Sequence, residues 1–133
     1  MKFNFQDYKR YEKQIILKKV GISGQKKIKS AKVLIIGIGG LGCPLLTYLA
    51  VSGVGTIGIV DNDKVEISNL SRQTLFNLND LGKFKVNQAK EKITKINDKI
   101  KIKTFKKKIN FNNIKSILKN FDIICDGTDN FET

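Results

Sequence analysis

Four glycines, Gly37, Gly39, Gly40 and Gly42, follow an apolar run rich in β-branched residues in the stretch VLIIGIGGLG. Three of them fit the G-x-G-x-x-G fingerprint, in which the backbone of a strand-to-helix turn approaches the phosphates of a nucleotide. Asp61 ends the next apolar run about 20 residues later, where such folds place the carboxylate that accepts the ribose hydroxyls. The pattern predicts a site for an adenosine nucleotide, with a tight turn that holds no ligand as the alternative.

A second group of polar residues follows Asp61. Asn69, Arg72 and Gln73 bring one guanidinium and two amides into a short stretch, SNLSRQ. Arginine occurs only twice in this lysine-rich chain, and its planar fork grips phosphate or carboxylate in a way that lysine cannot. Lys85 opens the next expected helix and could supply a second cation. A surface salt bridge is the alternative for Arg72, and chance placement among many lysines is the alternative for Lys85.

The last apolar run leads into CDGTDN. Because the carboxyl ends of parallel strands face the ligand crevice, Asp129 could hold magnesium and Asp126 could support it, with helix capping as the alternative. Cys43 follows the glycines, where a helix N-terminus would lower its pKa, but close packing against the sheet is the favoured interpretation. The chain has no histidine and no CxxC pair, which excludes a Ser-His-Asp triad and argues against a zinc site.

The apolar periodicity indicates which elements must position these residues. We expect helices over 7–20, 41–52, 80–97 and 111–120, and strands over 32–36, 56–61, 100–105 and 121–125. Residues 62–79 are rich in turn formers and should form a long functional loop. The order predicts an α/β fold with a Rossmann-like, doubly wound, mainly parallel sheet. We expect a helical segment over 1–30 and a β-α-β-α-β-α-β core over 31–133.

Composition narrows the function classes. The net charge of +13 suggests nucleic-acid binding, but the lysines are spread along the chain and are not interleaved with aromatic residues. High lysine, asparagine and isoleucine content is typical of an A/T-rich genome, so we expect no nucleic-acid partner. No apolar run approaches the roughly 20 residues that span a bilayer, and the N-terminus lacks the apolar stretch of a signal peptide. We expect no membrane partner and a cytoplasmic location, or the plastid stroma if the gene is organelle-encoded.

The motifs together resemble the ThiF/MoeB/HesA family of adenylylating enzymes, which are related to ubiquitin-activating enzymes. RYEKQIIL, GIGGLG, DNDKVEISNLSRQ, GKFKV and DGTDN stand in the family's order and spacing, from about Arg10 to the end of the chain. The resemblance, which leans to the ThiF branch, implies ATP-dependent adenylylation of a carboxylate. The substrate would be the C-terminal Gly-Gly of a ubiquitin-like sulfur carrier, ThiS-like or MoaD-like, in thiamine or molybdopterin biosynthesis.

The resemblance also implies roles for individual residues. Arg72, Lys85 and Asp129 would be catalytic, with Mg²⁺ at Asp129. The glycine loop, Asp61 and Asn69 would contact the nucleotide. The family is homodimeric, and Lys13 stands where it usually carries an arginine that reaches the γ-phosphate of the partner's site. Lysine keeps the charge and loses the bidentate fork.

The family's domain continues for roughly another hundred residues, the size of a whole domain. We therefore expect residues 1–133 to be a single truncated nucleotide-binding domain, the N-terminal portion of a larger one. Such a chain should bind nucleotide weakly at best and should not adenylylate a carrier alone. Its fourth strand should form an exposed apolar edge. An NAD-dependent oxidoreductase and a non-catalytic nucleotide-binding or dimerisation remnant stay as alternatives.

Overall fold

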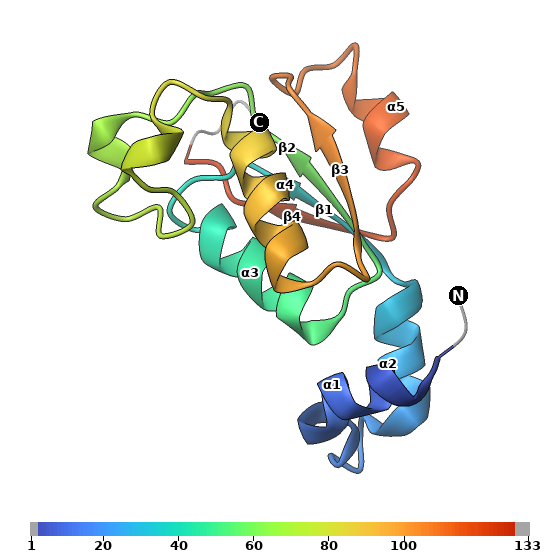
Figure 1. The fold of residues 1–133 in the computed structure, drawn as a ribbon. Helices are drawn as coiled ribbons and strands as arrows, with labels where there is room; N and C mark the ends of the chain where they lie inside the picture. The colour runs from blue at the N-terminus through green and yellow to red at the C-terminus, as the bar shows by residue number, and fades with distance from the viewer. Residues whose placement is uncertain (1–2, 130–133) are drawn as a thin grey trace.

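A four-stranded parallel sheet forms the centre of the computed structural model, which describes residues 3–129 (Figure 1). The strands are β1 (Lys32–Ile36), β2 (Thr56–Val60), β3 (Lys101–Phe105) and β4 (Ile123–Asp126). Their order across the sheet is β3-β2-β1-β4, and all three pairings are parallel. The predicted α/β, Rossmann-like fold is confirmed. In this arrangement the carboxyl ends of all four strands meet at one edge of the sheet.

Helices cover both faces of the sheet. Val33 and Ile35 of β1 pack in one apolar core with α3 (Gly42–Ser52) and α4 (Lys85–Ile96). Leu34 and Ile36 point to the opposite face, where α5 (Ile114–Leu118) supplies the cover. A parallel strand buried on both faces needs apolar residues at every position, which explains the unbroken run in β1.

The long segment between β2 and α4 contains two short 3₁₀ helices, η1 (Ile67–Asn69) and η2 (Leu78–Asp80). The expected helix over 80–97 is wrong at its start, because α4 begins at Lys85. Gly82 adopts a left-handed conformation with φ of 77°, which separates the 3₁₀ turn from the helix. The expected helix over 111–120 is also shorter, and the fourth strand begins two residues later than expected, at Ile123.

The N-terminal segment folds as two helices, α1 (Phe5–Ile15) and α2 (Gly21–Ser30). The expected single helix over 7–20 is therefore wrong at its end, and α2 was expected only as part of a helical segment over 1–30, with no bounds of its own. Both helices lie near the amino ends of the strands, away from the edge where the carboxyl ends meet (Figure 1). The side-chain amide of Asn97 holds α1 in place by donating a hydrogen bond of 3.0 Å to the hydroxyl of buried Tyr11.

The sheet has an apolar edge at β4, whose neighbour in the described part of the chain is β1. Ile123 and Ile124 are 53% and 43% exposed, as expected for a strand with one side uncovered. Among the helices of residues 3–129, none combines the length and the apolar character that crossing a membrane requires.

Candidate nucleotide-binding site

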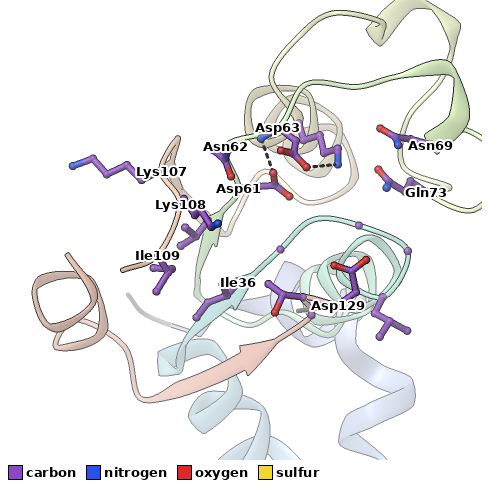
Figure 2. Close-up of a pocket in the computed structure, with 18 of the residues that line it drawn as sticks. Ile36, Asp61, Asn62, Asp63, Asn69, Gln73, Lys107, Lys108, Ile109 and Asp129 are labelled. Atoms are coloured by element: carbon purple, nitrogen blue, oxygen red, sulfur yellow. Dashed lines mark hydrogen bonds and ion pairs between the residues drawn. The ribbon is translucent and has the colours of Figure 1, made fainter. Parts of the chain in front are cut away.

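A cavity of about 670 Å³ lies at the carboxyl ends of the strands (Figure 2). The glycine loop, the segments that follow β2 and β3, and the end of β4 form its walls. Most of the residues predicted from sequence line it: Gly37, Gly39, Gly40, Asp61, Asn69, Arg72, Lys85 and Asp129. Three predicted residues do not, namely Gly42, Asp126 and Lys13. The fold thus brings residues that are up to 92 positions apart, Gly37 and Asp129, to one site.

The glycines of the loop meet different demands. Gly37 has φ of 87°, a conformation that L side chains rarely adopt. A β-carbon at Gly42 would lie 2.0 Å from the carbonyl oxygen of Gly37, so this glycine serves the close packing of helix on loop. A β-carbon at Gly39 or Gly40 would meet only side-chain atoms, the nearest 3.8 Å and 3.6 Å away. These two glycines leave an open cradle on the cavity side.

Asp61 fastens the glycine loop to the end of β2. Its Oδ2 accepts a hydrogen bond of 2.8 Å from the backbone N–H of Ile38, and its Oδ1 accepts one of 2.8 Å from the N–H of Asp63. Each carboxylate oxygen can accept a second hydrogen bond. The side chain therefore supports the loop and retains capacity for the hydroxyls of a ribose.

Lys85 is a buried cation at the start of α4. Its side chain is 6% exposed, and its Nζ lies 3.3 Å from Oδ2 of Asp63, whose side chain is 61% exposed. The backbone N–H of Lys85 also donates to the carbonyl of Asp63 at 3.0 Å. This burial and placement separate Lys85 from the lysines that fill solvated positions.

The loop after β2 contributes one guanidinium and two amides. Nη1 of Arg72 donates to the carbonyl of Ser68 at 3.1 Å, and the guanidinium stem passes over Gly40. Oδ1 of Asn69 accepts from the N–H of Glu66 at 3.0 Å. Gln73 is 2% exposed, and its Oε1 has no hydrogen-bond partner among residues 3–129. The two amides lie side by side (Figure 2), and the buried unpaired oxygen fits a site completed by a ligand or water.

Two aspartates, the last residue of β4 and a residue three positions after it, differ in position. Asp129 lines the cavity, whereas Asp126 does not. Oδ1 of Asp126 accepts from the N–H and the hydroxyl of Thr128, at 2.9 and 2.7 Å, which fits the local capping alternative, and its support of a metal stays a prediction. Asn130, the last residue of DGTDN, lies outside the described residues. Within 3–129 no group of three or more histidines, cysteines or carboxylates could hold a metal, but Mg²⁺ bound to phosphates needs only one or two carboxylates.

Cys43 is fully buried under the glycine loop. Burial raises the pKa of its thiol to about 11, against the ordinary 9.0, although the field of Lys85 acts in the opposite direction. A helix N-terminus alone would have lowered this pKa. The structure therefore supports the packing interpretation of Cys43.

Sequence reasoning missed one wall of the cavity. Lys107, Lys108 and Ile109 follow β3 and line the side beyond Asp61, where Ile109 packs in one apolar cluster with Ile36 (Figure 2). The three consecutive lysines at 106–108 looked like an ordinary solvent-exposed stretch and were not assigned to the site. The position directly after a strand was the signal, because every strand of such a sheet ends at the ligand edge.

Comparison with known proteins places the chain in a family. Residues 11–133 match the ThiF family. A protein of Porphyra purpurea named "Probable molybdopterin-synthase adenylyltransferase" is 46% identical over 129 residues, which is 97% of this chain and 34% of that protein. The chain thus spans about a third of the length of the curated relatives that it matches.

Solved structures share the fold of this chain. The crystal structure of PaaA matches with a TM-score of 0.85 and 31% identity, over 93% of this chain and 41% of that one. The crystal structure of Escherichia coli MccB with ATP matches with a TM-score of 0.78 and 35% identity, over 86% of this chain and 36% of that one.

Proposed function

The chain belongs to the ThiF family, and from that membership we propose that it binds ATP and provides the nucleotide site of an adenylyltransferase. The observation that carries the proposal is the convergence of the open glycine cradle, Asp61, Arg72, Lys85 and Asp129 on one cavity. The ATP complex of MccB, which is 35% identical, favours ATP over a nicotinamide dinucleotide.

The cavity supports a specific assignment of roles. The backbone at Gly39 and Gly40 approaches the phosphates, and Asp61 binds the ribose. Arg72 and Lys85 stabilise the charge that develops on the phosphates, with help from the amide of Asn69. Positioning and electrostatics supply most of the catalysis in phosphoryl-type transfer, and these residues provide both.

The reaction is an attack by a carboxylate on the α-phosphate of ATP. A bond forms between the carboxylate oxygen and phosphorus, the bond to pyrophosphate breaks, and an acyl adenylate results. The attacking carboxylate is already ionised, so no general base is required and the lack of histidine is no obstacle. Magnesium held by Asp129 would neutralise charge on the phosphates.

The proposed acyl substrate is the C-terminal Gly-Gly carboxylate of a ubiquitin-like sulfur carrier. The relatives carry molybdopterin-synthase or sulfurtransferase names, which favours a MoaD-like carrier and molybdopterin biosynthesis over the thiamine branch. A ThiS-like carrier is the alternative within the same chemistry.

We also propose a homodimer, in which Lys13 of one copy serves the site of the other. Lys13 is exposed on α1 and does not line the cavity of its own chain. Helix α1 lies near the amino ends of the strands (Figure 1), so we propose that Lys13 acts through a second copy. Exposed apolar side chains are available for such contact. Leu41 and Tyr48, beside and on α3, are largely exposed, and so is Ile16, after α1.

Exchange of labelled pyrophosphate into ATP tests the proposal. The assay compares residues 1–133 with the same residues fused to the C-terminal part of a ThiF-family relative, each with and without a MoaD-like carrier. Carrier-dependent exchange by the fusion supports the proposal. ATP binding without exchange would instead favour a non-catalytic nucleotide-binding module, and absence of ATP binding by both proteins would refute the assignment of the cavity.

A further inference from the structure

We propose that Asp63 is a resident counter-ion of the nucleotide cavity. Its carboxylate holds the ammonium of Lys85 when no phosphate is bound and yields it to the phosphates of the nucleotide. The proposal rests on the function proposed above and adds a residue that sets the affinity of the same site for polyphosphates.

The ion pair between the two residues is unequal. The Lys85 side chain is 6% exposed and cannot reach solvent freely, whereas the Asp63 side chain is 61% exposed. Buried charges are paired or neutralised, so the lysine needs an anion and the aspartate does not need a cation. The pair distance of 3.3 Å is long for a charge-assisted hydrogen bond, which typically measures about 2.7–2.9 Å.

The backbone around Asp63 is held firmly. Its N–H donates to Asp61, and its carbonyl accepts from the N–H of Lys85 (Figure 2 shows Asp63 beside Asp61). The next residue, Lys64, forms an antiparallel bridge with Phe84. Only the side chain of Asp63 is therefore left to move, and it can turn into solvent without any change in the segment.

Asp63 lines the same cavity as the glycine cradle and Arg72. Its negative charge stands where the anionic phosphates are proposed to bind, and like charges in one site oppose each other. A phosphate can take over the Lys85 ammonium at little cost, because the released carboxylate regains water.

The substitution Asp63→Asn tests the proposal. It removes the charge and leaves the two backbone hydrogen bonds in place. Without ligand, the melting temperature should fall by about 2–4 °C, because Lys85 loses its anion. Affinity for ATP and for tripolyphosphate should rise about two- to fivefold, the range of an exposed charge pair, with a smaller rise for AMP. Titrations are done in EDTA, so that bound magnesium does not contribute.

Asp98→Asn is the matched control. It makes the same change in net charge and breaks an exposed pair with Lys99, 3.5 Å long, outside the cavity. Its affinities should equal those of the unmodified chain. In a Lys85→Gln background, the gain in affinity for tripolyphosphate on adding Asp63→Asn should be no larger than the gain that Asp63→Asn gives for AMP. The reason is that the ammonium with which Asp63 pairs is absent.

Equal or weaker binding of tripolyphosphate by Asp63→Asn would overturn the counter-ion proposal. A gain for tripolyphosphate in a protein that prefers NAD to ATP would support the counter-ion and contradict the proposed function. A gain of the same size in Asp98→Asn would show that net charge alone acts, and would also overturn the proposal.

Discussion

Asp61 and Ile38 are joined by a hydrogen bond of 2.8 Å, in which the backbone N–H of Ile38 donates to Oδ2 of the carboxylate. Asp122 makes the equivalent contact at the other end of β1, where its Oδ2 accepts from the N–H of Lys32 at 2.8 Å. Two carboxylates thus hold the two ends of one strand segment, but only Asp61 lines the cavity. Substitutions at Asp61 and Asp122 can therefore distinguish an effect on stability from an effect on ligand binding.

Asp61→Asn should weaken ATP binding by about tenfold or more, because the amide cannot accept hydrogen bonds from both backbone N–H groups and from the ribose hydroxyls. The loss of an accepted backbone hydrogen bond should also lower the free energy of unfolding by about 1–3 kcal/mol. Asp122→Asn should change stability in the same direction and leave ATP affinity unchanged. Urea unfolding and calorimetric titration measure the two quantities. An equal loss of ATP affinity in both variants would show that Asp61 acts only through stability.

Two glycines of the loop, Gly40 and Gly42, should differ in the effect of an added methyl group. Gly40→Ala adds a methyl at ordinary contact distance from Arg72, so the variant should fold normally and lose ATP affinity because the cradle is filled. Gly42→Ala places a methyl 2.0 Å from a backbone oxygen and should lower the free energy of unfolding by about 1–3 kcal/mol, the range of overpacking. Thermal unfolding with and without ATP distinguishes them. Normal ATP affinity in Gly40→Ala would refute the cradle.

Arg72→Lys should weaken adenylate formation by about 1–3 kcal/mol although the charge is kept, because a point charge cannot contact two phosphate oxygens at once. Pyrophosphate exchange by the fusion protein measures the loss. Arg10→Lys is the control, since Arg10 donates to the carbonyl of Ile96 and lies outside the cavity. Unchanged exchange in Arg72→Lys would make Arg72 an ordinary surface residue.

Cys43 should resist alkylation at neutral pH. Its pKa is raised from 9.0 to about 11 by burial, so the folded state binds the thiol proton more tightly than the unfolded state does. Stability is therefore unaffected below pH 9 and falls between about pH 9 and 11, by at most about 2–3 kcal/mol. Alkylation of native and urea-unfolded protein, analysed by mass spectrometry, checks this. Rapid modification of native Cys43 at pH 7 would contradict the burial argument.

The sheet and the main site residues could be predicted from sequence because both depend on local patterns. Apolar runs identify buried parallel strands, and the residues just after them must share one edge of the sheet. The same rule would have found Ile109 and its neighbouring lysines. Asp63 was missed as a separate feature because its importance lies in the burial of its partner Lys85, which only the tertiary structure reveals.

Elements that depend on tertiary contacts were not predictable. Helix α2 contains two glycines and several lysines and has no strong apolar face, but the amide of buried Gln25 donates to the carbonyl of Ser52, and Ile28 packs on the main core. The start of α4 depends on the left-handed turn at Gly82, which a periodicity argument does not detect. The environment of Cys43 combines a helix start with full burial, and only the structure shows that burial dominates.

Calorimetric titration of the chain with ATP and with NAD, both in magnesium, decides which nucleotide the cavity prefers. We expect ATP to bind at least about tenfold more tightly than NAD, a difference of about 1.4 kcal/mol, because Arg72, Lys85 and Asp129 complement a chain of phosphates and a metal. Gly40→Ala should abolish this preference by filling the cradle. Tighter binding of NAD than of ATP would contradict the assignment of the cavity to ATP and, with it, the adenylylation proposal.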